Sequence, residues 1–174
     1  HSSDHNKNFG QLSLLQTELI FKTFRQRFQT HKDKGQVYIF HNRGKGAGES
    51  LIHPHSQLVV IPEEISLEIQ LPQQIDQNTT EMIQTINYNI FSPESSEWPD
   101  EVWLAPRSSA LQNEVGVART FGDATDEEIT DLSKVITKLV QIFEKKHGKD
   151  FSYNFYIYPK ANWYLRFIPR VRIL

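Results

Sequence analysis

The sequence predicts a mixed fold of helices and strands, built from two unequal copies of one unit. The order helix, strand, strand occurs twice along the 174 residues. Each copy closes on an Ile-Pro dipeptide, at residues 61–62 and 168–169. A Ser-Ser pair stands at nearly the same offset in each copy, at residues 2–3 and 108–109. We interpret these observations as an internal duplication.

In the first copy, a helix is expected from Ser13 to about Gln29, because Ser13 and Gln16 have the spacing of a capping box. The apolar residues that recur at helical spacing along it are Leu15, Leu19, Ile20, Phe24 and Phe28. "QVYIFHN" (36–42) then predicts a strand. "QLVVIP" (57–62) predicts a second, more buried strand that ends at its proline.

In the second copy, Thr125 and Glu128 form a capping box at the start of a helix, and Gly148 is its stop signal. The apolar stripe of this helix consists of Leu132, Ile136, Leu139 and Phe143. Four further segments predict strands. Two lie before the helix, "TINYNIF" (85–91) and "EVWLAPR" (101–107), and two after it, "FSYNFYIYP" (151–159) and "NWYLRFIPR" (162–170).

The two copies divide the chain into residues 1–72 and 82–174, and a polar segment at about 63–80 is the expected connector. The first copy lacks counterparts to the two strands that precede the helix of the second. A partial sheet with unpaired edge strands is unfavourable in a native protein, because the exposed backbone groups can pair with other chains. We therefore expect the first repeat to be incomplete and the chain to begin inside a larger protein.

Composition narrows the class of protein. The hydrophobic content of 38% and the aromatic content of 11% suit a globular domain with a core. The net charge of −2 gives no basic footprint for nucleic acid or anionic lipid, and no apolar run approaches the roughly 18 residues of a membrane span. Cysteine is absent, so this chain alone forms neither a disulfide nor a thiolate metal site. We expect a cytoplasmic protein.

A glycine-rich loop follows the first predicted strand. Gly44, Gly46 and Gly48 allow the backbone to approach a ligand and to turn its N–H groups inward, which suits phosphate oxygens. Ser50 adds a hydroxyl donor, and Asn42 adds an amide at the end of the strand. The alternative is a flexible turn without a ligand.

Two histidines follow this loop. His53 and His55 share one side of an extended segment, and Pro54 stiffens the chain between them. A neutral ring nitrogen is a competent nucleophile toward phosphorus, provided that the other ring nitrogen holds the proton, and a backbone carbonyl could fix that tautomer. The alternatives are two ordinary surface histidines, or a pair of histidines that binds a metal only by chance.

At these residues the chain resembles a known family. "GAGESLIHPHSQL" (46–58) resembles the active-site motif of galactose-1-phosphate uridylyltransferases, in the histidine triad superfamily. "SSDHNKNFGQLS" (2–13) and "IFHNRG" (39–44) also resemble segments of this family. In the second half, "FSPESSEWPDEVWLAPR" (91–107) and "NWYLRFIPR" (162–170) fit its pattern. The resemblance therefore covers nearly the whole chain.

The resemblance implies an α+β, histidine-triad-like fold of two repeats, each an antiparallel sheet with packed helices. It implies that His55 is the nucleophile that becomes uridylylated and that Gln57 steadies the phosphoryl group. The phosphate-binding positions it implies are Asn42, Gly48 and Ser50. It implies His5 and His53 as zinc ligands, and the two cysteines that usually complete that site would lie outside this chain.

Gln57 bears on the type of reaction. Hydrolases of the superfamily typically have a third histidine at this position, whereas an amide cannot take a proton from water. We therefore expect ping-pong nucleotidyl transfer between a nucleotide-sugar and a sugar-1-phosphate, in galactose metabolism. The resemblance also implies a homodimer. The alternatives are a phosphorylase of dinucleoside polyphosphates or NDP-sugars, and a catalytically decayed nucleotide-binding module.

The chain also departs from the family pattern. Trp163, Tyr164 and Arg166 stand where the family has histidines for a second metal, so no metal is expected there. Asn162 aligns with His55, and we interpret the second copy as scaffold or dimer surface. Glu49 occupies a loop position that is often small, and its carboxylate would repel phosphate if it faced inward.

Overall fold

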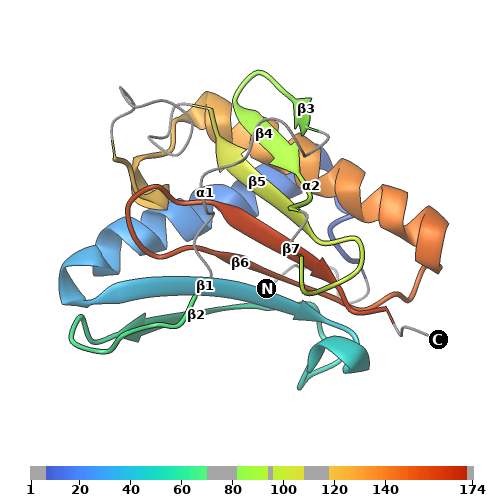
Figure 1. Ribbon diagram of the computed structural model, residues 1–174, viewed down its shortest axis with the longest axis horizontal. Coiled ribbons are helices and arrows are strands. Elements are labelled where there is room, and N and C mark those ends of the chain that lie inside the picture. Colours follow the sequence, from blue (N-terminus) through green and yellow to red (C-terminus); the bar gives the residue numbers. More distant parts are fainter. Residues whose placement is uncertain (1–6, 70–81, 94–95, 108–117, 172–174) are drawn as a thin grey trace.

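The computed structural model describes residues 7–69, 82–93, 96–107 and 118–171. It has an α+β fold in which two helices pack on a seven-stranded antiparallel sheet (Figure 1). The helices are α1 (Leu14–His31) and α2 (Asp126–His147), and the short 3₁₀ turns are η1 (Lys32–Lys34), η2 (Lys45–Ala47) and η3 (Phe121–Asp123). The strands are β1 (Gln36–Arg43), β2 (Ser56–Ile61), β3 (Met82–Gln84), β4 (Tyr88–Phe91), β5 (Val102–Pro106), β6 (Tyr153–Ile157) and β7 (Leu165–Pro169).

The sheet is continuous across both halves of the chain. Its strand order is β2-β1-β6-β7-β5-β4-β3, and every neighbouring pair is antiparallel. Within the sheet, the two halves meet at the pair β1–β6, in which Ile39 lies opposite Ile157 and Asn42 lies opposite Asn154. The expected order helix, strand, strand is present twice, as α1-β1-β2 and α2-β6-β7. The division into repeats at 1–72 and 82–174 stays a prediction.

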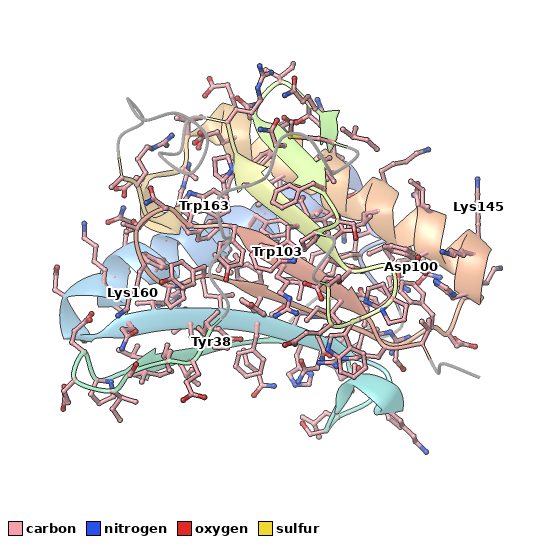
Figure 2. The ribbon with its side chains drawn as sticks, viewed as in Figure 1. Tyr38, Asp100, Trp103, Lys145, Lys160 and Trp163 are labelled. Carbon is pink, nitrogen blue, oxygen red and sulfur yellow. The ribbon has the colours of Figure 1, made fainter. Side chains whose placement is uncertain are left out.

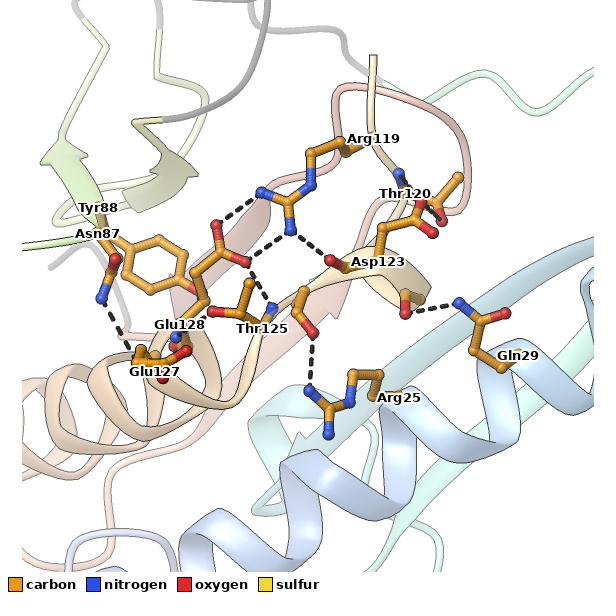
Figure 3. A network of polar contacts seen from close by, with 12 residues as sticks. Arg25, Gln29, Asn87, Tyr88, Arg119, Thr120, Asp123, Thr125, Glu127 and Glu128 are labelled. Carbon is orange, nitrogen blue, oxygen red and sulfur yellow. Dashed lines mark hydrogen bonds and ion pairs between the residues drawn. The ribbon is translucent and has the colours of Figure 1, made fainter. Parts of the chain in front are cut away.

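Both helices begin where the capping boxes predict. Ser13 caps α1 by accepting from the N–H of Gln16. Thr125 caps α2 in the same way, with Glu128 as its reciprocal partner. Arg119 also donates two hydrogen bonds of 2.8 Å to the Glu128 carboxylate (Figure 3), which ties the segment before the helix to its first turn.

Two hydrophobic layers cover the two faces of the sheet. The layer beneath the helices includes Phe21 and Ile136 on the helices and Phe155 on β6, each 0–1% exposed. The opposite face carries an aromatic cluster that includes Tyr38 and Trp103 (Figure 2). Alternate residues of a strand point to opposite faces, which explains how β6 serves both layers.

A buried ion pair lies within the aromatic cluster. Arg166 donates to both carboxylate oxygens of Glu101, at 2.6 and 2.8 Å, and Glu101 is fully buried. Trp103 Nε1 also donates to this carboxylate. The guanidinium lies 5.4 Å from the centre of the Trp103 ring. Removal of one partner would leave a buried charge, so this contact holds β7 and β5 in register.

The structure corrects several expectations from the sequence. β2 is not a more buried strand: it lies at one edge of the sheet, and none of its residues is buried. β3, at the other edge, was not expected as a separate strand. The Ser-Ser pairs and residues 70–80 of the connector lie outside the described residues. None of the described helices is long and apolar enough to cross a membrane.

The apolar stripe expected on α1 is wrong at its N-terminal end. Leu15 is 76% exposed and Leu19 is 64% exposed. The residues of α1 that are buried are Thr17, Phe21 and Phe28. Spacing alone did not separate these faces, because apolar residues occur on both sides of the helix.

The two faces of α1 should respond differently to truncation. Phe21→Ala removes a fully buried ring and should lower the free energy of unfolding by about 3–5 kcal/mol. Leu15→Ala should change it by no more than about 0.5 kcal/mol, since the side chain is exposed. Urea unfolding monitored by circular dichroism measures both. Equal losses in the two variants would contradict the observed orientation of α1.

Candidate functional site

The glycine loop leaves the end of β1 in a conformation that requires glycine. Gly44 and Gly48 have φ angles of 83° and 74°, in the left-handed region that other residues rarely adopt. A Cβ atom on Gly44 would lie 2.3 Å from Ser152 Oγ, so this glycine also permits close packing against the second half of the chain. A Cβ atom on Gly48 would meet open space. Gly48 is therefore required by backbone conformation alone.

The loop is bonded to Asn42 through the second half. Asn154 Nδ2 donates to Asn42 Oδ1 at 2.7 Å and to the Ala47 carbonyl at 2.8 Å. Arg170 Nε donates in turn to Asn154 Oδ1. The Gly46 N–H donates to Ser152 Oγ at 3.2 Å. Residues just before and within β6, supported by Arg170 just beyond β7, thus hold the loop against the sheet.

Glu49 faces into the loop. Its side chain is only 7% exposed, and Oε2 accepts from the Gly44 N–H at 2.8 Å. The same oxygen lies 3.4 Å from Arg43 Nη1. In this conformation the Gly44 amide therefore serves an internal carboxylate, and a phosphate group would have to bind the other donors of the loop.

The His53–His55 segment has the geometry that a nucleophilic histidine needs. His55 Nδ1 lies 2.8 Å from the backbone carbonyl of His53. A carbonyl oxygen only accepts, so Nδ1 carries the proton and the lone pair of the neutral ring is on Nε2. Pro54 is buried, which anchors the segment between two half-buried histidines. The carbonyl that fixes the tautomer comes from the motif itself.

His41, on β1, lies next to this segment. The sequence analysis did not predict it as a site residue. Its Nδ1 is 3.0 Å from Ser56 Oγ, and its ring stacks on Phe155 with 5.0 Å between ring centres. Burial lowers the pKa of His41 to about 3, so the ring is neutral at physiological pH. His41, His55 and Ser56 line one cavity together with Phe9.

Two further sequence-predicted residues, Ser50 and Gln57, are described by the structure. Ser50 is exposed in the bend that follows the loop. Gln57 is exposed in β2, opposite Phe40 of β1, whose ring belongs to the aromatic cluster. His5 lies outside the described residues. The described contacts thus connect His53 with His55, and Asn42 with the glycine loop.

The described residues do not by themselves make up a zinc site. No group of three or more His, Cys, Asp or Glu side chains that could hold a metal occurs within residues 7–69, 82–93, 96–107 and 118–171. His53 is the predicted ligand that the structure describes, and the sequence supplies no cysteine to accompany it.

Comparison with known proteins supports the resemblance of the motifs. Residues 1–61, which contain α1, β1, the glycine loop and His55, match the family description "Galactose-1-phosphate uridyl transferase, N-terminal domain". Over these residues the chain is similar to the galactose-1-phosphate uridylyltransferase family. This match covers the part of the chain that carries every candidate site residue.

Relatives align along most of the chain at low identity. The galactose-1-phosphate uridylyltransferases of Haemophilus influenzae and Thermotoga maritima are 24% and 22% identical to it, over 88% of its length. An ADP-glucose phosphorylase of Arabidopsis thaliana is 20% identical over the same share. The alignments cover 48%, 52% and 48% of these proteins, so the chain spans about half the length of the curated relatives it matches.

Solved structures share the fold. A uridylyltransferase superposes with a TM-score of 0.76 at 19% identity, covering 97% of this chain and 60% of that one. The Arabidopsis thaliana ADP-glucose phosphorylase, solved with bound ADP-glucose, gives a TM-score of 0.78 at 17% identity, covering 99% and 63%. At these identities the likeness establishes the architecture, and the activity has to be argued from the site.

The buried His41 should make stability depend on pH. Its pKa falls from 6.5 to about 3 on folding, so between these values the unfolded state binds a proton that the folded state excludes. The free energy of unfolding should therefore fall as the pH is lowered from 6.5 toward 3, with a slope contribution of up to about 1.4 kcal/mol per pH unit.

The variant His41→Gln lacks this titration and should show a flatter profile over the same range in urea unfolding. His31→Gln, at the end of α1, is the matched control. A profile for His41→Gln that coincides with the wild type would show that His41 is not the group responsible.

Proposed function

We propose that this chain carries the nucleotidyl-transfer site of a hexose-1-phosphate uridylyltransferase-type enzyme and works by a ping-pong mechanism. The observation that carries the proposal is the 2.8 Å contact between His55 Nδ1 and the His53 carbonyl, because it places the lone pair on Nε2. The family match over residues 1–61 supports the assignment. The nucleotide, the sugar and a homodimeric state belong to the same proposal.

In the first step, Nε2 of His55 attacks the α-phosphorus of a nucleotide-sugar. The new N–P bond forms as the bond from phosphorus to the bridging oxygen breaks, and the sugar-1-phosphate leaves with that electron pair. The ring becomes cationic when Nε2 bonds to phosphorus, because Nδ1 keeps its proton. The His53 carbonyl, which accepts from Nδ1, stabilises this charge. In the second step, another sugar-1-phosphate attacks the same phosphorus and releases His55.

The donors that would hold the phosphoryl group are Asn42, Ser50 and the amides around Gly48. Gly48 provides a left-handed turn with open space at its Cα, which lets a ligand approach the backbone. The Gln57 amide can donate an N–H to a phosphoryl oxygen but cannot take a proton, so it would not activate water against the covalent intermediate. Transfer to a second phosphate is thereby favoured over hydrolysis.

A second candidate is an NDP-sugar phosphorylase, in which inorganic phosphate attacks the nucleotidyl-histidine. The similarity to the ADP-glucose phosphorylase, 20% identical over 88% of the chain, favours this alternative. Another candidate, from a different class, is a nucleotide-binding module that has lost catalysis. The internal carboxylate of Glu49 and the absence of cysteine favour it.

His55 should become covalently labelled. The protein is incubated with UDP-glucose or ADP-glucose labelled at the α-phosphate, and acid-labile label is located by peptide mapping after alkaline quenching. His55→Ala should lower labelling by at least about 1000-fold, since the nucleophile is lost. His31→Gln should be labelled as the wild type is. Binding of the nucleotide-sugar without any label would support the binding module instead.

Gln57→His should raise hydrolysis of the covalent intermediate relative to transfer by about tenfold, because an imidazole can activate water. Gln57→Asn is the matched control that keeps an amide. Release of nucleoside monophosphate and formation of the new nucleotide-sugar are measured together by chromatography. An unchanged ratio in Gln57→His would count against the role assigned to this amide.

A further inference from the structure

Two side chains from the second half of the molecule bond to the glycine loop of the first half, and a third supports one of them. Ser152 accepts from the Gly46 N–H, and Asn154 donates both to Asn42 and to the Ala47 carbonyl. Arg170 donates to Asn154. The bond between Gly46 and Ser152 joins residues 106 positions apart in the sequence. The loop is therefore shaped by residues outside its own half of the chain.

The chemistry of the partners fixes the direction of each bond at Asn154. Arg170 Nε–H can only donate, so the Asn154 atom that faces it is the oxygen. The Ala47 carbonyl can only accept, so the atom facing it is the Asn154 amide nitrogen. Two partners of opposite character thus leave Asn154 with a single side-chain orientation.

The orientation of Asn154 determines that of Asn42. Asn154 Nδ2 also donates to Asn42 at 2.7 Å, so the Asn42 atom on that side is its oxygen. The Asn42 amide N–H2 group is then the part of the side chain that can donate elsewhere. Arg170 is the first donor in this chain of hydrogen bonds. Its position is fixed by a cation–π contact, because its guanidinium lies 4.0 Å from the centre of the Trp98 ring.

We propose that Arg170 and Asn154 are positioning residues that turn the amide N–H2 group of Asn42 toward the phosphate of a bound nucleotide. The proposal rests on the proposed function, in which Asn42 binds that phosphate. A reversed Asn42 would present its carbonyl oxygen to the phosphate oxygens and repel them. The second half of the chain therefore acts on the site in the first half, beyond a role as scaffold or dimer surface.

The first test is Asn154→Asp, which keeps the shape and the contact with Arg170 but removes the amide donor. A carboxylate can only accept, so Asn42 has to reverse in order to bond with it. Binding of uridine monophosphate and adenosine monophosphate, measured by calorimetry, should weaken by about 10- to 100-fold, as expected for a lost bond to a charged group. Equal affinity in Asn154→Asp and the wild type would overturn the proposal.

Arg170→Lys separates orientation from charge. Lysine keeps the positive charge but lacks the Nε–H that fixes Asn154, so nucleotide binding should weaken by about tenfold. Arg107→Lys is the matched control, because Arg107 is exposed and donates to the Thr85 carbonyl at 3.0 Å. Wild-type affinity in Arg170→Lys would show that Arg170 does not act through its Nε–H.

A double-mutant cycle shows whether Asn154 acts through Asn42. In an Asn42→Ala background, Asn154→Asp should weaken nucleotide binding by no more than about twofold further, because the group it positions is gone. Additive losses would point to a general structural role and overturn the proposal. Thermal unfolding of each variant shows that the protein remains folded.

The same binding data distinguish failure of this inference from failure of the proposed function. Nucleotide binding that depends on Asn154, with no label on His55, would reject the transfer mechanism and keep the positioning role. Label on His55 with affinities unaffected by Asn154→Asp would do the reverse. No measurable nucleotide binding by the wild type would overturn both.

Discussion

The antiparallel pairing of β1 with β6 is the contact on which the rest of the structure depends. It makes one sheet from strands of both halves and places the helices side by side on one of its faces. It also sets Asn42 directly opposite Asn154. A slip of either strand by one residue would move its core side chain, Ile39 or Ile157, to the other face, so burial of both fixes the register that aligns the two amides.

The elements that could be predicted from the sequence are those with local signals. Ser13 and Thr125 begin their helices because a capping hydroxyl satisfies an amide within three residues. The wrong predictions concern burial, which depends on neighbours. Leu15 repeats at helical spacing, yet it faces solvent, and β2 is apolar although it forms an edge of the sheet. A pattern gives the period of a segment, whereas the fold decides which side is covered.

In the candidate site, too, the features with a local signal could be predicted and those that depend on the fold could not. His53 and His55 are close in the sequence, and the bond that fixes the tautomer of His55 lies within the motif, so this part could be anticipated. Asn154 and Arg170 carry no local signal, because their role exists once β6 and β7 lie beside the glycine loop. His41 is a comparable case, since its neutrality results from burial behind the motif.

The antiparallel pairing also explains why the two ends of the sheet have different chemistry. The loop between β1 and β2 and the turn between β6 and β7 lie at opposite ends, because Arg43 pairs with Tyr153. In that turn stands Asn162, which aligns with His55 and has a φ of 59°. Its N–H donates to the Arg119 carbonyl at 2.9 Å, which ties the turn to the segment before η3. An amide nitrogen has no available lone pair to attack phosphorus, so this end offers no second nucleophile at the aligned position. The second half contributes instead at the other end, through the side chains that hold the glycine loop.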